Sequence, residues 1–329
     1  MSTPLLSVEQ LTVSAPGAAE RVRIVDGIGL AVSPGETLAL VGESGCGKSM
    51  TALAIMRLVP PPLRIHAGSR VLFEGRDILA LPATEMRTVR GAQMATIFQE
   101  PMTSLNPVTR VGAQVQEAIT LHSDVSPFAA RMQVIDLFEM VGIPDPHKRI
   151  DAYPHQLSGG LKQRVMIAMA MALKPRLLIA DEPTTALDAT IRAQILDLIR
   201  NLTANTGTAV LLITHDFGVV NELADRVAVM YAGQIVEEGT REDLLARPKH
   251  PYAQGLLKSI PRAEQRGGRL EEIQGVVPRP GQWPDGCRFH TRCPYVFDDC
   301  VFEPPARTIV SATQAARCHL LTGKALDPT

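Results

Sequence analysis

Aromatic side chains are scarce in this chain, at 4% of its 329 residues, and only one of them is a tryptophan. Excess charge is also lacking, since 33 lysines and arginines stand against 34 aspartates and glutamates, for a formal net charge of −1. No global field therefore attracts nucleic acid or anionic lipid. The basic residues form no run of the kind found in nucleic-acid-binding arms. Nucleic acid is not expected as a partner.

Long apolar runs are missing as well. The longest apolar stretch, residues 165–173, is far shorter than the roughly 18 residues that a membrane-spanning helix needs. The first residues, 1–8, show no basic segment ahead of an apolar one, so a secretory signal peptide is not expected. We therefore expect a protein that stays in the cytosol and meets a membrane only through a partner.

A glycine-rich segment, Gly42-Glu43-Ser44-Gly45-Cys46-Gly47-Lys48-Ser49, fits the phosphate-loop pattern G-x-x-x-x-G-K-[ST]. It follows a predicted strand at 37–41 and opens a predicted helix at Lys48. The loop N–H groups and the helix N-terminus favour one bound phosphate group, while Lys48 adds a charge and the Ser49 hydroxyl a ligand for Mg²⁺. The residues expected to contact nucleotide here are Gly42, Ser44, Gly45, Cys46, Gly47, Lys48, Ser49 and Met50.

Two interpretations of Cys46 stay open. It is either a small residue that fits a variable position of the motif, or a thiol that the helix end makes acidic and hence sensitive to oxidation.

Two adjacent carboxylates, Asp181 and Glu182, follow an apolar strand predicted at 177–180. A carboxylate at such a strand end is suited to hold Mg²⁺ through water, which we expect of Asp181. We expect Glu182 to orient and polarise the water that attacks the γ-phosphate.

A third motif, Leu157-Ser158-Gly159-Gly160, opens another predicted helix, whose N–H groups form a second anion site. An LSGG run between a phosphate loop and an apolar strand ending in Asp-Glu resembles the ATP-binding-cassette (ABC) ATPases. The resemblance covers residues 5–240. It implies a head-to-tail dimer in which this helix, through Ser158 and Gly160 at its start, caps ATP held by the other subunit.

The same resemblance implies roles for four further residues. Gln99 would contact the metal and the attacking water and link the core to a helical insertion. His215, after a strand predicted at 209–214, would be the switch histidine of the family. Asp188 would lie in the loop that communicates across the dimer, and Arg149 would reach the partner's nucleotide. The family's adenine-stacking aromatic has no counterpart near residues 13–16, so adenine is expected to pack on aliphatic side chains such as Val22.

The alternation of strands and helices predicts an α/β fold with a parallel sheet and covering helices. The resemblance specifies a phosphate-loop NTPase of the ABC cassette type, with a RecA-like core, an N-terminal antiparallel β region and a helical insertion. We expect a nucleotide-binding domain at 1–240, with the insertion at about 101–173. Composition shifts to proline, arginine and cysteine after Gly239, which predicts a small C-terminal extension at 241–329.

Several segments resemble the peptide-importer branch of this family, namely residues 102–107, 153–157, 249–252, 278–281 and 286–295. This implies an ATPase subunit that couples ATP hydrolysis to uptake of dipeptides or oligopeptides at the cytoplasmic face of the inner membrane. Its partners would be a second, related ABC ATPase, two membrane-spanning permease subunits and, indirectly, a substrate-binding protein. The alternatives are import of nickel or another small solute by the same machinery, and a soluble ABC ATPase outside transport.

The chain has five cysteines, which is too few for a secreted disulfide scaffold. Four of them lie near the C-terminal end: Cys287, Cys293, Cys300 and Cys318. Four thiols in a proline-rich, core-poor segment suggest a metal staple. The tight cysteine pair usual in zinc sites is absent, whereas the ligand count and nearby arginines fit a [4Fe–4S] cluster. A cluster, zinc and unligated thiols stay open as interpretations.

Overall fold

The computed structural model describes residues 3–17, 21–98, 104–185, 187–259 and 272–322. Contacts divide the chain into two compact units, which are described one at a time. The helical unit comprises Met1–Leu5, Val32–Glu36 and Ala80–Leu212, and the loop unit comprises Leu6–Ala31, Thr37–Leu79 and Ile213–Thr329.

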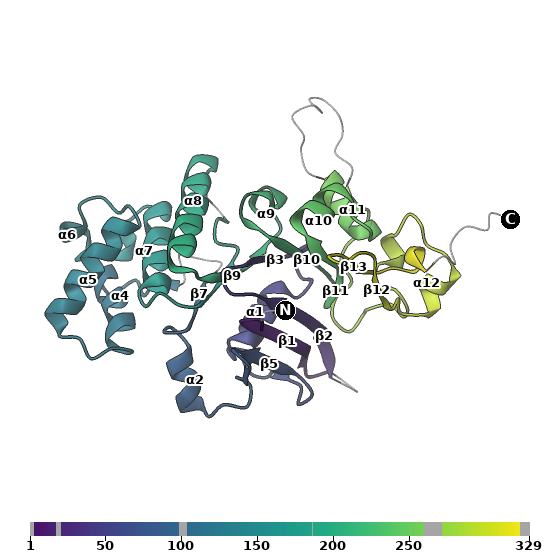
Figure 1. Cartoon of the computed structure of the whole chain (residues 1–329), viewed down its shortest axis with the longest axis horizontal. Helices are drawn as coiled ribbons and strands as arrows, with labels where there is room; N and C mark the ends of the chain where they lie inside the picture. Colours follow the sequence, from purple (N-terminus) through teal and green to yellow (C-terminus); the bar gives the residue numbers. More distant parts are fainter. Residues whose placement is uncertain (1–2, 18–20, 99–103, 186, 260–271, 323–329) are drawn as a thin grey trace. The chain divides into compact units, whose positions relative to one another are not determined.

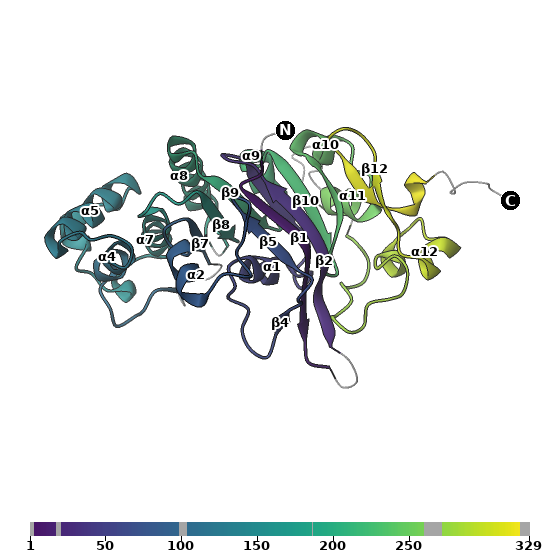
Figure 2. The ribbon, with the colours of Figure 1, turned by 60° about the horizontal axis from the view of Figure 1, so that its bottom comes forward.

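The loop unit contains a sheet in the order β2-β1-β5-β6, in which β4 and β5 pair antiparallel with β1 and β6 pairs antiparallel with β5. Figure 2 labels β1, β2, β4 and β5 of this sheet. Leu6 faces Phe73 and Val8 faces Val71 across β1 and β5, so alternate residues of β1 face the same buried side. Apolar and polar residues alternate at 5–13 and 21–32, a pattern that favours strands, and β1 and β2 occupy these segments. The strands are β1 (Leu6–Ala15), β2 (Val22–Val32), β4 (Arg64–Ile65), β5 (Arg70–Phe73) and β6 (Arg76–Asp77).

A second run of strands in the loop unit has the order β12-β13-β11-β10-β3. β3 and β10 are parallel and nearly fully buried, as their apolar sequences predict, while β11, β13 and β12 pair antiparallel. Glu237 lies opposite Ala316, so residues of the C-terminal extension complete this sheet. The strands are β3 (Thr37–Val41), β10 (Arg226–Tyr231), β11 (Gln234–Thr240), β12 (Arg307–Ile309) and β13 (Ala315–Arg317).

The helices of the loop unit are short. They are α1 (Lys48–Ile55), α9 (Phe217–Leu223), α10 (Arg241–Ala246), α11 (Pro251–Lys258) and α12 (Asp298–Phe302), with 3-10 turns at His290–Arg292 and His319–Leu321.

The helical unit is built around β7 (Met94–Ile97) and β8 (Leu177–Asp181), which are parallel, and β9 (Ala209–Thr214) begins in it. Its helices α4 to α7 group together (Figure 1) around a core that includes Val115, Phe138 and Val165, each fully buried. The helices are α2 (Ala83–Val89), α4 (Val111–Thr120), α5 (Pro127–Met140), α6 (Pro146–Arg149), α7 (Gly159–Met171) and α8 (Ala189–Thr206).

Apolar residues at 191, 195, 198, 199 and 202 indicate an amphipathic helix, and the helix found there is α8, which extends beyond these positions at both ends. It begins after Asp188, whose side chain caps it, and ends at Gly207, which adopts a left-handed conformation (φ 68°). In the described part of the chain, no helix combines the length and apolar character needed to cross a membrane.

Candidate nucleotide site

The phosphate-loop motif connects β3 to α1 in the loop unit. Its backbone approaches its neighbours so closely that glycine is needed at two positions. A Cβ on Gly42 would lie 2.2 Å from the Met230 carbonyl oxygen, and one on Gly47 would lie 3.1 Å from the Ile24 carbonyl oxygen. Gly47 also has φ 111°, which L side chains rarely adopt. The loop is therefore shaped by β2 and β10.

Lys48 begins α1 and turns back into the loop. Its Nζ donates to the carbonyl oxygens of Gly42 at 2.6 Å and of Glu43 at 3.1 Å, and its side chain is buried. Ser49 and Met50 follow in the first turn of α1, whereas Ser44 and Gly45 are exposed. The ammonium thus lies among the backbone groups that the motif predicts to surround phosphate.

Cys46 is 1% exposed, and burial raises the pKa of its thiol, with Lys48 opposing the shift. The interpretation as a small residue that fits is therefore supported, and the interpretation as an acidic, oxidation-prone thiol is wrong. Desolvation disfavours the thiolate more than the neighbouring ammonium favours it.

His215 belongs to the same unit and follows β9 directly, where its side chain is exposed. The residues on either side fix the turn: the Asp216 N–H donates to Thr214 Oγ1 at 3.0 Å, and Asp216 Oδ1 accepts the Gly218 N–H at 2.8 Å to cap α9.

Asp181 and Glu182 lie in the helical unit, at the end of β8, and both are buried. Glu182 has φ 51°, a left-handed conformation that turns the chain sharply after the strand and is uncommon outside glycine. Thr185 Oγ1 donates to Glu182 Oε2 at 2.9 Å. The hydroxyl therefore fixes the direction of the carboxylate.

The LSGG segment begins α7, which Ser158 caps by accepting the Leu161 N–H at 3.4 Å. One turn further on, Gln163 Nε2 donates to the Pro183 carbonyl oxygen at 2.6 Å. This buried hydrogen bond ties the LSGG helix to the turn that carries Glu182.

The starts of α7 and α8 pack against each other. A Cβ on Gly160 would lie 2.9 Å from Ile191 Cγ2, and Asp188 caps α8 by accepting the Ile191 N–H at 2.9 Å. The structure therefore brings Ser158, Gly160 and Asp188 into one neighbourhood.

Two predicted residues are less informative. Arg149 ends α6 and is half-buried. Gln99 lies outside the described residues, as do Met102 and Thr103 of the 102–107 run.

The remaining predicted site residues fall into two groups, with the phosphate loop and His215 in the loop unit and the others in the helical unit. The Ser49 hydroxyl and the Asp181 carboxylate are hard oxygen donors of the type that Mg²⁺ prefers.

The four C-terminal cysteines lie within one part of the loop unit. The Cys287 N–H donates to the Cys300 carbonyl oxygen at 2.9 Å, and all four thiols are free. Burial, with the neighbouring thiolates adding to it, raises the pKa of Cys318 to about 12 and that of Cys287 to about 11. Among the described residues, no three or more histidine, cysteine, aspartate or glutamate side chains are arranged to hold a metal ion. The softness of the donors fits a cluster, but their arrangement is not that of a closed metal site.

Sequence reasoning missed how the extension is attached. Arg288 pairs with Asp26 of β2, donates to the Ala232 carbonyl oxygen at 2.5 Å and stacks on the Trp283 ring at 3.8 Å. Nearby, a Cβ on Gly281 would lie 3.2 Å from Val22. The single tryptophan thus belongs to the segment that packs beside the start of β2, and only its rarity in the chain could have drawn attention to it.

Two family models match the chain. That for the ABC transporter matches residues 25–185, and that for the oligopeptide/dipeptide transporter C-terminal region matches residues 236–300. The dipeptide transport ATP-binding protein DppD of Escherichia coli (strain K12) is 47% identical over 99% of both chains. DppD of Bacillus subtilis (strain 168) is 48% identical over 96% of this chain and 94% of the relative. The chain belongs to the ABC transporter family.

Solved structures agree with this assignment. The dimeric ATP-binding cassette MJ0796 bound to ADP and Pi has a TM-score of 0.64 and 25% identity, over 72% of this chain and 98% of that one. CbiO1 of Clostridium perfringens, from a cbiONQ complex, has a TM-score of 0.62 and 25% identity over 75% of this chain and 92% of that one. The predicted ABC cassette fold is confirmed.

As a member of this family, the chain is the ATP-hydrolysing subunit of an ABC transporter, and it binds ATP with Mg²⁺. It works with membrane-spanning permease partners and associates with the membrane peripherally. The predictions of a transporter ATPase and of ATP and Mg²⁺ as its ligands are confirmed at this level.

Proposed function

We propose that this chain hydrolyses ATP to drive the import of dipeptides or short oligopeptides. The observation that carries the proposal is the match of residues 236–300 to the oligopeptide/dipeptide transporter C-terminal region, a segment additional to the cassette itself. Relatives named for dipeptide and oligopeptide transport support it, because their similarity extends over nearly the whole chain.

In this proposal the phosphate loop, residues 42–50, surrounds the β- and γ-phosphates and Lys48 supplies the positive charge. Ser49, Asp181 and Gln99 would hold Mg²⁺, which would supply positive charge against the phosphates. Glu182 accepts a proton from the attacking water, and His215 contacts the γ-phosphate. The products are ADP and phosphate.

The nucleotide is shared between two cassettes. The α7 N-terminus, with Ser158 and Gly160, supplies N–H groups to ATP held by a second, related ATPase subunit. Arg149 and Asp188 act across the same interface. Two permease subunits receive the helical insertion, proposed at about 101–173, at the cytoplasmic face of the inner membrane. A substrate-binding protein delivers the cargo from the other side, and the extension at 241–329 follows the nucleotide-binding domain at 1–240.

Uptake of labelled dipeptide into vesicles that contain the co-purified transporter tests the proposal. Glu182→Gln is expected to abolish ATP turnover and uptake while ATP binding is kept, because the amide cannot accept the proton. Glu242→Gln is the matched control, since the Glu242 side chain is 78% exposed on α10, and should leave uptake unchanged. Uptake of nickel or another solute in place of peptide would contradict the proposed cargo.

We also propose that the four cysteines hold a [4Fe–4S] cluster. The support is their number, their common location and their soft donor atoms. Because burial raises the pKa of Cys287, Cys293 and Cys318, cluster binding would displace protons from these thiols and should weaken at low pH. Iron and acid-labile sulfide, measured on anaerobically purified protein, should each approach about four atoms per chain. Zinc without sulfide would contradict the cluster.

A further inference from the structure

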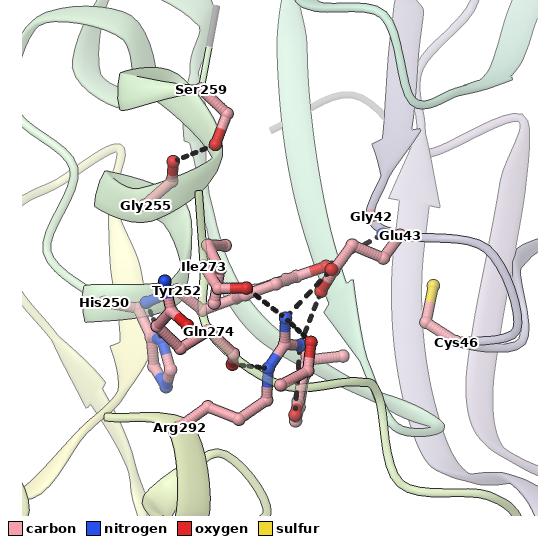
Figure 3. Close-up of polar contacts among 12 residues, drawn as sticks. Gly42, Glu43, Cys46, His250, Tyr252, Gly255, Ser259, Ile273, Gln274 and Arg292 are labelled. Carbon is pink, nitrogen blue, oxygen red and sulfur yellow. Dashed lines mark hydrogen bonds and ion pairs between the residues drawn. The ribbon is translucent and has the colours of Figure 1, made fainter. Parts of the chain in front are cut away.

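The second residue of the phosphate loop, Glu43, carries a negative charge into a loop that we propose holds a triphosphate. A free carboxylate at this position would repel the phosphates. Instead, Arg292 of the C-terminal extension binds it in a bidentate manner (Figure 3). Nη1 lies 2.7 Å from Glu43 Oε2 and Nη2 lies 3.0 Å from Oε1. Paired fork-to-fork contacts of this kind are the strongest ion-pair geometry available to arginine.

Arg292 is itself held in place before it reaches Glu43. Its side chain is 3% exposed, its Nε donates to the Gln274 carbonyl oxygen at 2.9 Å, and its Nη2 lies 3.3 Å from the carbonyl oxygens of Ile273 and Gly275. Burial disfavours the charged form, but the contacts with Glu43 and Tyr231 outweigh it and raise the pKa of Arg292. The guanidinium is therefore a fixed, permanent positive charge.

Tyr252 holds the backbone of the same residue. Its hydroxyl oxygen accepts the Glu43 N–H at 2.8 Å, and its ring is fully buried against Tyr231, with ring centroids 4.6 Å apart. Burial raises the pKa of Tyr252, so the hydroxyl stays neutral. Two elements of the extension, α11 and the turn before Cys293, thus converge on one loop residue.

The start of α11 is built to place Tyr252. His250 Nδ1 accepts the Tyr252 N–H at 3.0 Å, and Glu237 of β11 accepts the N–H groups of Lys249 and His250 at 2.8 and 2.7 Å. The Lys249-His250-Pro251-Tyr252 segment therefore has a structural consequence at the phosphate loop.

We propose that Arg292 and Tyr252 are positioning residues for ATP binding: they hold Glu43 and neutralise it, and so set the affinity of the phosphate loop for ATP. The inference rests on the proposed role of this loop in ATP binding. A purely structural role for Arg292, attachment of the extension, makes a different prediction. In that case the charge of Glu43 would not matter to the nucleotide.

The test is the ATP dissociation constant of the full-length chain with Mg²⁺, measured by competition with a fluorescent ATP analogue. Arg292→Gln is expected to weaken binding about tenfold, since it frees the Glu43 carboxylate beside the phosphates. The double variant Glu43→Gln/Arg292→Gln should return to within about threefold of the parent, because the repelling charge is gone. Arg292→Lys should lie between Arg292→Gln and the parent, since it keeps the charge but loses the fork.

Tyr252→Phe should weaken binding about fivefold by leaving the Glu43 N–H without its acceptor. Arg307→Gln is the matched control, because Arg307 of the extension binds Glu238 of β11 at 2.6 Å, and the hydrogen bonds and ion pairs described for its side chain go to Glu238 rather than to residues 42–49. It should leave the dissociation constant unchanged. Thermal unfolding of each variant reports whether the fold is kept.

Unchanged affinity in Arg292→Gln would overturn the inference. The inference would also be overturned if Arg292→Gln lowered ATP affinity and the double variant did not restore it, since that result assigns Arg292 to attachment of the extension alone. If Arg292→Gln fails to fold, Arg292→Lys and Tyr252→Phe decide, and parental affinity in both overturns it. Lys48→Ala separates the two proposals: unaltered ATP affinity in that variant contradicts the proposed nucleotide site itself.

Discussion

His250 is a single buried residue with a predictable effect on stability. It is 1% exposed, and burial lowers its pKa to about 3. Its Nδ1 accepts the Tyr252 N–H, so a proton on that nitrogen would break the cap of α11. Glu237 accepts the His250 backbone N–H, and burial raises the pKa of Glu237. The native state therefore keeps His250 neutral, whereas the unfolded chain protonates it below about pH 6.5.

The free energy of unfolding should accordingly fall as the pH is lowered from 7 to 5. Because the unfolded state binds one more proton, His250 should account for a decrease of about 2 kcal/mol in the free energy of unfolding over this range. His250→Asn keeps a capping oxygen but does not titrate in this range. Urea denaturation at several pH values should give a slope that is shallower for His250→Asn than for the parent. Parallel slopes would contradict a neutral, buried imidazole.

Residue-level prediction placed Lys48 at the start of α1 and Asp181 and Glu182 at the end of β8, where the structure has them, while their chemical roles stay predictions. It failed at Glu43, which occupies a variable position of the phosphate loop, because the partner, Arg292, lies 249 residues away in sequence. No local pattern links two such positions. The wrong interpretation of Cys46 had a related cause, since a helix N-terminus indicates an acidic thiol only if the thiol is not buried.

At the scale of elements, the junction of α4 and α6 is too tight for any side chain at Gly112. A Cβ there would lie 2.4 Å from the Ile150 carbonyl oxygen and 2.1 Å from Ile150 Cγ1. Gly112→Ala should therefore lower the free energy of unfolding by about 1–3 kcal/mol, as overpacking does, despite the better helix propensity of alanine. Gly68→Ala is the control, because a Cβ at Gly68 meets nothing within 4 Å. Equal melting temperatures for the two variants would contradict this packing.

The first strands and the helix after the phosphate loop could be predicted from alternation and from the motif. β11 could not, because its sequence, Gln-Ile-Val-Glu-Glu-Gly-Thr, places an acidic residue at a buried position. Glu237 is tolerated there because Gln314 Nε2 and two backbone N–H groups donate to it from distant segments. β12 and β13 are too short to show a period, and they form by adding to the edge of β11.

For the molecule as a whole, we propose that ATP is shared by two cassettes. The LSGG helix of one chain then serves the phosphate loop of the other, so turnover requires association, whereas ATP binding by a single chain does not. Substitution of the LSGG residues should therefore lower turnover, whereas substitution of Arg292 should lower ATP binding itself.

ATP hydrolysis per chain, measured over a range of protein concentrations for equimolar mixtures of the related ATPase subunit with the parent or with Ser158→Trp, tests this claim most directly. The account predicts that the parent rate rises with concentration to a plateau, and that Ser158→Trp lowers the plateau by at least about a hundredfold while ATP affinity is unchanged. A rate per chain that is independent of concentration, together with full turnover by Ser158→Trp, would contradict it.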